Sequence, residues 1–150
     1  MMRKEIAELS EKYKEIFENC ANAIWATPEI NFTEHRSHAA ARKYMEDLGF
    51  EISMLPDMDT AFIATAGHGK PVIGILGELD ALPGLSQKAD VDQHDPVENG
   101  APGHGCGHNL LGCGGMECAY ILWKYFQEHN LEGTIKYFSC PAEEGGVGKV

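Results

Sequence analysis

The sequence lacks a long hydrophobic run, a dense basic patch and a compact cysteine framework. No apolar stretch approaches the roughly 18 residues that a membrane-spanning helix needs, so we expect no membrane partner. Only 12 lysines and arginines stand against 23 aspartates and glutamates, and the resulting net charge of −11 argues against nucleic acid as a partner. The first ten residues are charged and amphipathic, which is not typical of a secretory signal.

The cysteines number five, an odd count, and they lie in periodic or apolar segments rather than in a small, loop-rich framework. This pattern predicts reduced thiols in a cytoplasmic protein. Cys20, Cys113, Cys118 and Cys140 are expected to be small buried hydrophobic side chains. Cys106 differs from them, because glycines surround it and a histidine follows two residues later.

Hydrophobic periodicity predicts an α/β fold of one domain. Apolar residues at three- and four-residue steps indicate helices, and short runs rich in β-branched residues indicate strands. The predicted helices cover residues 3–26, 35–48 and 109–129, and the predicted strands cover residues 50–55, 60–66, 71–79 and 134–140. In folds with this order, functional sites gather beyond the carboxyl ends of the strands.

The second helix has recognisable start and stop signals. Thr33 is a plausible N-cap and Gly49 a natural C-terminal stop. Its buried face is predicted to comprise Ala39, Ala40, Tyr44 and Leu48. For the third helix, the apolar residues available for packing are Leu110, Leu111, Tyr120, Ile121, Leu122, Trp123 and Phe126.

The segments between these helices carry further expectations. The nearly continuous apolar run 72–76 suits a central strand that is covered on both faces. Residues 67–70 form a tight-turn sequence before it. The polar segment 83–105 is long for a loop inside a compact domain, and loops of this length are usually functional or disordered.

Cys106 and His108 form the first candidate cluster, in the glycine-rich segment 103–109. In an extended turn, residues two apart can point to the same side. A thiolate and an imidazole together suit zinc or another borderline transition metal. The N-terminus of the following helix would favour the thiolate form of Cys106. A buried thiol beside a capping histidine remains the alternative.

Two acidic clusters follow predicted strands. Of the adjacent pair Glu143 and Glu144, one carboxylate could bind a metal while the other takes a proton from water. A solvated turn is the alternative for this pair. Glu78 and Asp80 share a strand face, and Asp80 could accept a hydrogen bond from a ligand imidazole. A helix or turn cap is the alternative for Asp80.

Three motifs in order, residues 77–83, 103–112 and 140–146, resemble the amidohydrolase branch of the aminoacylase and carboxypeptidase G metallopeptidase family. Residues 84–87 and the long segment before Cys106 are most similar to its p-aminobenzoyl-glutamate hydrolase subgroup. The resemblance covers essentially the whole chain. It implies a three-layer α/β/α catalytic domain with a mixed sheet, and a two-metal site, zinc or manganese, that hydrolyses the amide of an N-acyl amino acid.

The resemblance also implies roles for individual residues. Cys106, His108 and Glu144 would be metal ligands, Glu143 the general base, and Asp80 the residue that orients a ligand. Many family members have His-x-Asp where this chain has Glu78-Leu79-Asp80, which makes Glu78 only a possible ligand. His104 is a second possible ligand near the site.

Family members are far longer than this chain. The resemblance therefore predicts the N-terminal part of the catalytic domain, without the dimerisation domain and the C-terminal catalytic half, and with apolar strand surface left exposed. The resemblance also implies a homodimer or hetero-oligomer for the full-length protein. A fragment that keeps the fold with weak or no metal binding is the main alternative. A thiol redox protein using Cys106 and Cys113 is a third hypothesis, which the lack of a C-x-x-C motif disfavours.

Overall fold

The computed structural model describes residues 2–146 and 148. The predicted α/β fold is confirmed, and the end of each element lies within two residues of its predicted place. The elements are α1 (Met2–Trp25), α2 (His35–Asp47), β1 (Glu51–Leu55), β2 (Met58–His68), β3 (Val72–Glu78), α3 (His108–Glu128) and β4 (Gly133–Cys140).

The four strands form a mixed sheet in the order β1-β2-β4-β3. β1 and β2 are antiparallel, as are β2 and β4, whereas β3 and β4 are parallel. A parallel pair requires a crossover, and α3 supplies it. The mixed sheet expected for the family is thus present.

The central position predicted for residues 72–76 is wrong within the described part of the chain. β3 is an edge strand, because β4, the last strand in the sequence, lies between it and β2. Its outer side chains are open to solvent: Val72 is 58% exposed and Leu76 is 55% exposed. The continuous apolar run 72–76 therefore belongs to a strand with one solvent-exposed face, not to a strand that is covered on both faces.

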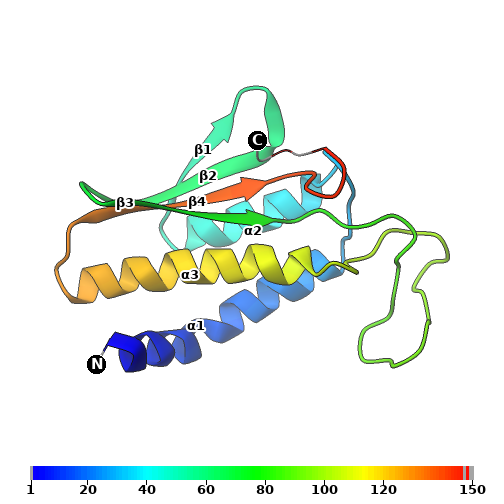
Figure 1. Ribbon diagram of the computed structural model, residues 1–150, viewed down its shortest axis with the longest axis horizontal. Coiled ribbons are helices and arrows are strands. Elements are labelled where there is room, and N and C mark those ends of the chain that lie inside the picture. Colours follow the sequence, from blue (N-terminus) through cyan, green and yellow to red (C-terminus); the bar gives the residue numbers. More distant parts are fainter. Residues whose placement is uncertain (1, 147, 149–150) are drawn as a thin grey trace.

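The three helices of the described chain lie on one side of the sheet, with α2 and α3 next to the strands and α1 beyond them (Figure 1). Alternate strand residues such as Phe62, Ile135 and Tyr137 point into the core, where they meet Met45 and Met116. The opposite sheet face carries an apolar hollow of about 460 Å³, which confirms the expected exposed strand surface. Its lining includes Leu55, Met58, Ile63, Leu76 and Phe138.

The expected N-cap of α2 is wrong, and its buried face is only partly as expected, since Tyr44 and Leu48 pack against the core while half-buried. The N-cap position is Glu34, while the Thr33 hydroxyl bonds the Ile30 carbonyl instead. Ala39 is exposed, and the buried residues are Ser37, His38, Ala41 and Met45. The buried face was partly misplaced because Ser37 and His38 look solvent-facing from their polarity. In the structure, the Ser37 hydroxyl donates to the Thr27 carbonyl, and the His38 ring packs edge-on against Phe62.

Three expected core residues of α3 are instead exposed. Leu110 is 66% exposed and Leu111 is 51% exposed, because the first turn of α3 projects past the end of the sheet. Cys118 is also exposed, whereas Cys20, Cys113 and Cys140 are buried as predicted. All five cysteines are free thiols.

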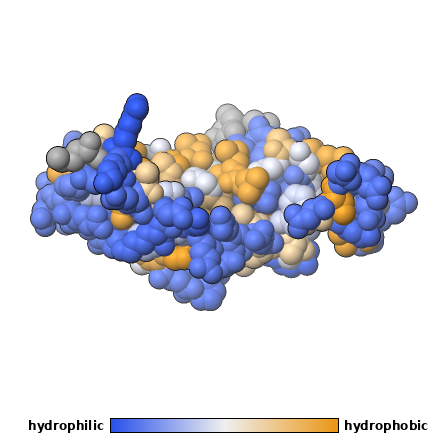
Figure 2. All heavy atoms as spheres, turned by 90° about the horizontal axis from the view of Figure 1, so that it is seen from below, coloured by the Kyte–Doolittle hydropathy of each residue, from blue (hydrophilic) through white to orange (hydrophobic). Residues whose placement is uncertain are grey.

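The surface seen from the α1 side is mostly hydrophilic, with apolar atoms gathered in limited patches (Figure 2). The exposed charges of α1 include ion pairs one helical turn apart, such as Lys4 with Glu8. Among the described residues, no helix is both long and apolar enough to cross a membrane. Backbone hydrogen bonds between Leu82 and Gly103 close the two ends of the segment 83–105.

Close packing of α3 on β3 depends on a glycine. A Cβ on Gly112 would lie 2.5 Å from the Glu78 carbonyl oxygen, whereas one on Gly114 would meet nothing within 4 Å. We expect Gly112→Ala to lower the free energy of unfolding by about 1–3 kcal/mol through overpacking. Gly114→Ala, the matched control, should raise it by up to about 1 kcal/mol through helix propensity. Urea unfolding measures both changes, and equal effects would contradict the role of Gly112.

Candidate metal centre

The parallel pairing of β3 and β4 brings the acidic clusters together. Glu78 at the end of β3 is the register partner of Cys140 at the end of β4. The residues that follow both strands therefore lie together, beyond the carboxyl ends of β3 and β4. This is the place where functional sites of α/β folds are expected. The N-terminus of α3 reaches this place as well, and it carries Cys106 and His108.

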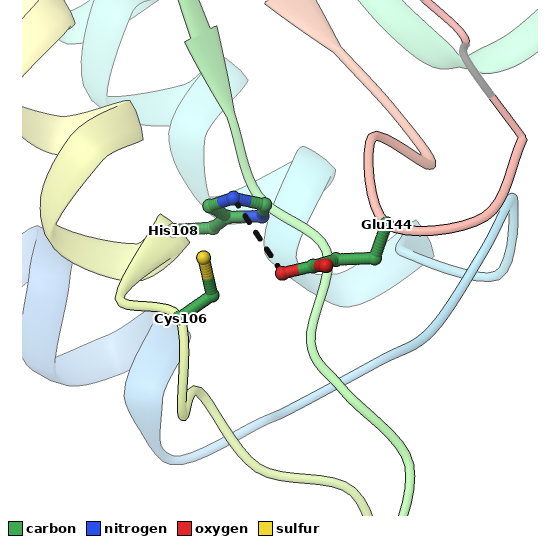
Figure 3. A group of neighbouring side chains, drawn as sticks. All are labelled: Cys106, His108 and Glu144. Atoms are coloured by element: carbon green, nitrogen blue, oxygen red, sulfur yellow. Dashed lines mark ion pairs between the residues drawn. The ribbon is translucent and has the colours of Figure 1, made fainter.

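Cys106, His108 and Glu144 point toward one another in this region (Figure 3). Gly107, the N-cap residue of α3, has φ of +90°, a left-handed conformation that favours glycine. This turn brings the exposed Cys106 and the buried His108 to the same side. One ligand atom from each of the three residues lies within 4.8 Å of the others.

The His108 ring is oriented by Asp80. Nδ1 lies 3.0 Å from Asp80 Oδ1 and 3.1 Å from the Asp80 carbonyl oxygen. Both neighbours are acceptors, so we assign the Nδ1 proton to this side. The lone pair of a neutral ring is then on Nε2, where a metal would bind. Asp80 is 1% exposed and thus has the place expected of the residue that orients a ligand.

Three carboxylates surround Nε2 of His108. Glu78 Oε2 lies at 3.2 Å, and Glu143 Oε2 and Glu144 Oε1 each lie at 3.8 Å. Glu78, His108 and Glu143 form a second group whose ligand atoms lie within 4.8 Å of one another. Like charges this close repel each other in a partly buried site. A divalent cation would offset that repulsion, and thiolate, imidazole and carboxylate are all donors that zinc accepts.

The turn after β4 is fixed to the same aspartate. The Glu144 amide donates to Asp80 Oδ2 at 2.8 Å, while Asp80 Oδ1 bonds His108. The two oxygens of one carboxylate therefore hold two of the candidate ligands. Glu144 has a less exposed side chain than Glu143, 20% against 37%, which suits a ligand and a base respectively.

The protein environment without a cation disfavours the Cys106 thiolate, contrary to the effect expected from the helix N-terminus. A hydrogen bond with the Glu144 carboxylate raises the pKa of Cys106, and the negative charges of Glu144, Glu143 and Glu78 add to this. A bound cation would reverse this balance.

Alkylation of Cys106 by iodoacetamide tests this electrostatic effect. Since the pKa is raised, less thiolate is present between about pH 7 and 9 than for an ordinary cysteine. Glu144→Gln removes the largest cause, lowers the pKa and should speed alkylation of the metal-free protein several-fold. Mass spectrometry of the Cys106 peptide gives the rate, with Cys118 as the internal reference. An unchanged rate would contradict the assigned cause.

Of the two possible further ligands, Glu78 lies within a donor group and His104 lies outside both groups. Glu78 lies beside His108 Nε2, within one of the two donor groups. His104 belongs to neither group: its Nε2 lies 3.2 Å from the Ile24 carbonyl oxygen, and burial lowers its pKa. Sequence reasoning missed Glu34, which is fully buried near Asp80. Nothing in its local sequence distinguishes it from a surface glutamate.

No family model matches the chain. Individual proteins do match it. The chain is 41% identical to a subunit of p-aminobenzoyl-glutamate hydrolase from Escherichia coli over 145 residues, which cover 96% of this chain and 30% of that protein. It is 29% identical to N-acetyldiaminopimelate deacetylase of Pediococcus pentosaceus over 131 residues, covering 83% of this chain and 32% of that protein.

Among solved structures, a dinuclear metal binding peptidase of the M20 family from Bacillus subtilis superposes with a TM-score of 0.65 and 25% identity. The match covers 87% of this chain and 36% of that one. The chain is a relative of the M20 peptidases. The M20 relationship confirms the metallopeptidase resemblance and the α/β fold with a mixed sheet. The third layer of the expected α/β/α arrangement is not found among the described residues, whose helices lie on one side of the sheet (Figure 1). The chain thus spans about 30% of the length of each of these two relatives.

Proposed function

We propose that this chain forms part of a metal-dependent hydrolase that cleaves the amide bond of an N-acyl amino acid such as p-aminobenzoyl-glutamate. The observation that carries the proposal is the convergence of Cys106, Glu78, Glu143 and Glu144 on His108. The similarity to the Escherichia coli p-aminobenzoyl-glutamate hydrolase supports the substrate class.

The proposed roles are those that the resemblance implies, and the proximity of the donor atoms supports them. Cys106, His108 and Glu144 would hold one divalent cation, and Glu78 is placed to contribute to a second. A cation in this site supplies a Lewis acid and lowers the pKa of water that it binds. The thiolate ligand favours zinc, while the carboxylates accept zinc or manganese.

Glu143 is proposed as the proton carrier. Its carboxylate is the more exposed of the pair, and it lies 3.8 Å from His108 at the edge of the donor cluster. From this position it can accept a proton from the attacking water and pass it to the nitrogen of the leaving amino acid. Asp80 keeps the His108 ring and the Glu144 backbone in place while the proton moves.

We further propose that residues 1–150 are the N-terminal part of the catalytic domain. The fraction of each relative that the chain covers supports this, as does the open apolar sheet face. Homodimers or hetero-oligomers are proposed for the whole protein. Five free cysteines support a reducing compartment such as the cytoplasm.

Hydrolysis of p-aminobenzoyl-glutamate in the presence of zinc or manganese tests the function. We expect Glu143→Gln to lower the rate by about 100-fold or more, the size of a general-base contribution. The same variant should still bind metal, because Glu143 is not one of the proposed ligands of the Cys106 site. The assay follows release of p-aminobenzoate by chromatography.

The matched control is Glu128→Gln, which removes a carboxylate at the far end of α3. Metal binding without turnover by the 150-residue chain would favour the alternative of a non-catalytic fragment. Turnover that Glu143→Gln leaves unchanged would contradict the role of Glu143.

A further inference from the structure

A buried glutamate outside the donor cluster contacts the turn that carries Glu143 and Glu144. Glu34 occupies the N-cap position of α2 but makes no side-chain capping bond to that helix. Its side chain is 0% exposed. Glu34 Oε1 instead accepts a hydrogen bond of 2.8 Å from the backbone amide of Ala142, far along the chain.

Ala142 has a conformation that needs support. Its φ of +53° is in the left-handed region, which costs a residue with a Cβ about 1–2 kcal/mol. Ala142 is itself fully buried, and its carbonyl accepts a bond of 2.8 Å from the Gly146 amide. The left-handed residue directly precedes Glu143, so its conformation sets the direction in which both glutamates leave the sheet.

We propose that Glu34 is a positioning residue of the metal centre, which holds the Ala142 backbone so that Glu143 and Glu144 face Cys106 and His108. This inference rests on the proposed function. Two carboxylates then hold the turn on either side of Glu143. Glu34 binds the amide before it, and Asp80 binds the amide after it.

The burial of Glu34 supports a specific role. Moving a carboxyl group out of water is costly unless it is hydrogen-bonded. Burial raises the pKa of Glu34, and Asp80 nearby adds to the increase. Within residues 2–146 and 148, Oε2 of Glu34 has no hydrogen-bond partner. Backbone hydrogen bonds from Ala142, from Phe32 and from Glu34 itself act against this increase in the pKa. Of these, the bond to Ala142 joins Glu34 to a distant part of the chain, where an apolar side chain would fill the volume at lower cost but would not hold the turn.

The test compares two replacements of similar size. Glu34→Gln keeps an oxygen that can accept the Ala142 hydrogen bond, whereas Glu34→Met keeps the length and removes the acceptor. In the metal-free protein, we expect Glu34→Met to speed amide hydrogen exchange at residues 142–146 at least 10-fold and to leave residues 106–109 within about 2-fold. Glu34→Gln should stay close to the wild type at both places. If Glu34→Met does not fold, Glu34→Asp replaces it, since the shorter side chain withdraws the same oxygen.

A second readout follows the metal centre itself. Zinc affinity, measured by competition with a chromophoric chelator, should fall about 10–100-fold in Glu34→Met and little in Glu34→Gln. The absorption spectrum of the cobalt-substituted protein should change in the same variant, because it reports ligand geometry. Exchange that rises throughout the chain, or an affinity and spectrum that match the wild type, would overturn the proposal and leave Glu34 a purely structural residue.

The two readouts separate this inference from the function on which it rests. If the wild-type chain bound neither zinc nor cobalt, the proposed metal centre would fail, and with it the positioning role for a metal. Amide exchange in the metal-free protein would still show whether Glu34 holds the turn. If the wild type binds metal and exchange at residues 142–146 is the same in all variants, only the role of Glu34 is wrong.

Discussion

Cys106→Ser is expected to abolish stable metal binding. Cys106 is the only thiol in the two donor groups found among the described residues, and its loss leaves His108 and Glu144 as the remaining members of its group. A hydroxyl group is a much poorer zinc ligand than a thiolate at neutral pH. We expect the zinc affinity to fall by more than about 100-fold, beyond the effect typical of residues that only orient ligands.

Elemental analysis after dialysis measures this change. The wild type should retain about one or more equivalents of zinc or manganese, and Cys106→Ser should retain almost none. Cys118→Ser is the matched control, since Cys118 is an exposed thiol on α3 outside the donor groups. Equal metal content in the wild type and Cys106→Ser would remove Cys106 from the site. No metal in any of the proteins would favour the fragment that keeps only the fold.

Asp80→Ala is expected to have the second-largest effect, because Asp80 holds two candidate ligands at once. Its oxygens bond His108 Nδ1 at 3.0 Å and the Glu144 amide at 2.8 Å. Without it, zinc affinity should fall about 10–100-fold. The metal-free protein should also lose about 1–3 kcal/mol in free energy of unfolding, since buried donors are left unpaired.

Asp80→Asn makes this prediction sharper. In asparagine an NH2 donor replaces one of the two carboxylate oxygens, so an acceptor remains either at the His108 position or at the Glu144 amide position. It should therefore recover only part of the lost zinc affinity. Asp95→Ala, which breaks an exposed ion pair with Lys88, should change both quantities little. Chelator competition and urea unfolding give the two numbers. Wild-type zinc affinity in Asp80→Ala would show that Asp80 does not orient the ligands.

Local sequence patterns predicted the positions of the helices and strands well, but they predicted less well which of their residues are buried. Helical periodicity and short β-branched runs located the seven helices and strands of the described residues, because both are local properties of the sequence. The buried face of α2 was partly misplaced because Ser37 and His38 are polar. Their burial depends on partners far away in the sequence, namely the Thr27 carbonyl and the Phe62 ring. The apolar run of β3 likewise could not reveal that β4 would take the inner place.

For the site, the sequence by itself determined the donor types and their motifs. A thiol and an imidazole two residues apart, and acidic residues after two strands, are local features of the chain. They were sufficient to predict a metal centre and the family resemblance. The convergence of the motifs followed from one further rule, that sites in α/β folds gather at the carboxyl ends of strands.

Only the tertiary structure decided how these groups act on one another. It brought Glu78 to 3.2 Å from His108, raised the pKa of Cys106 through the Glu144 carboxylate, and buried Glu34 beneath Ala142. Each of these effects joins residues that are far apart in the sequence, and distance in space is set by strand pairing and helix packing rather than by neighbouring residues. Electrostatic and hydrogen-bond energies depend on those distances. The motifs could therefore predict the donor types of the site, but not the distances between them.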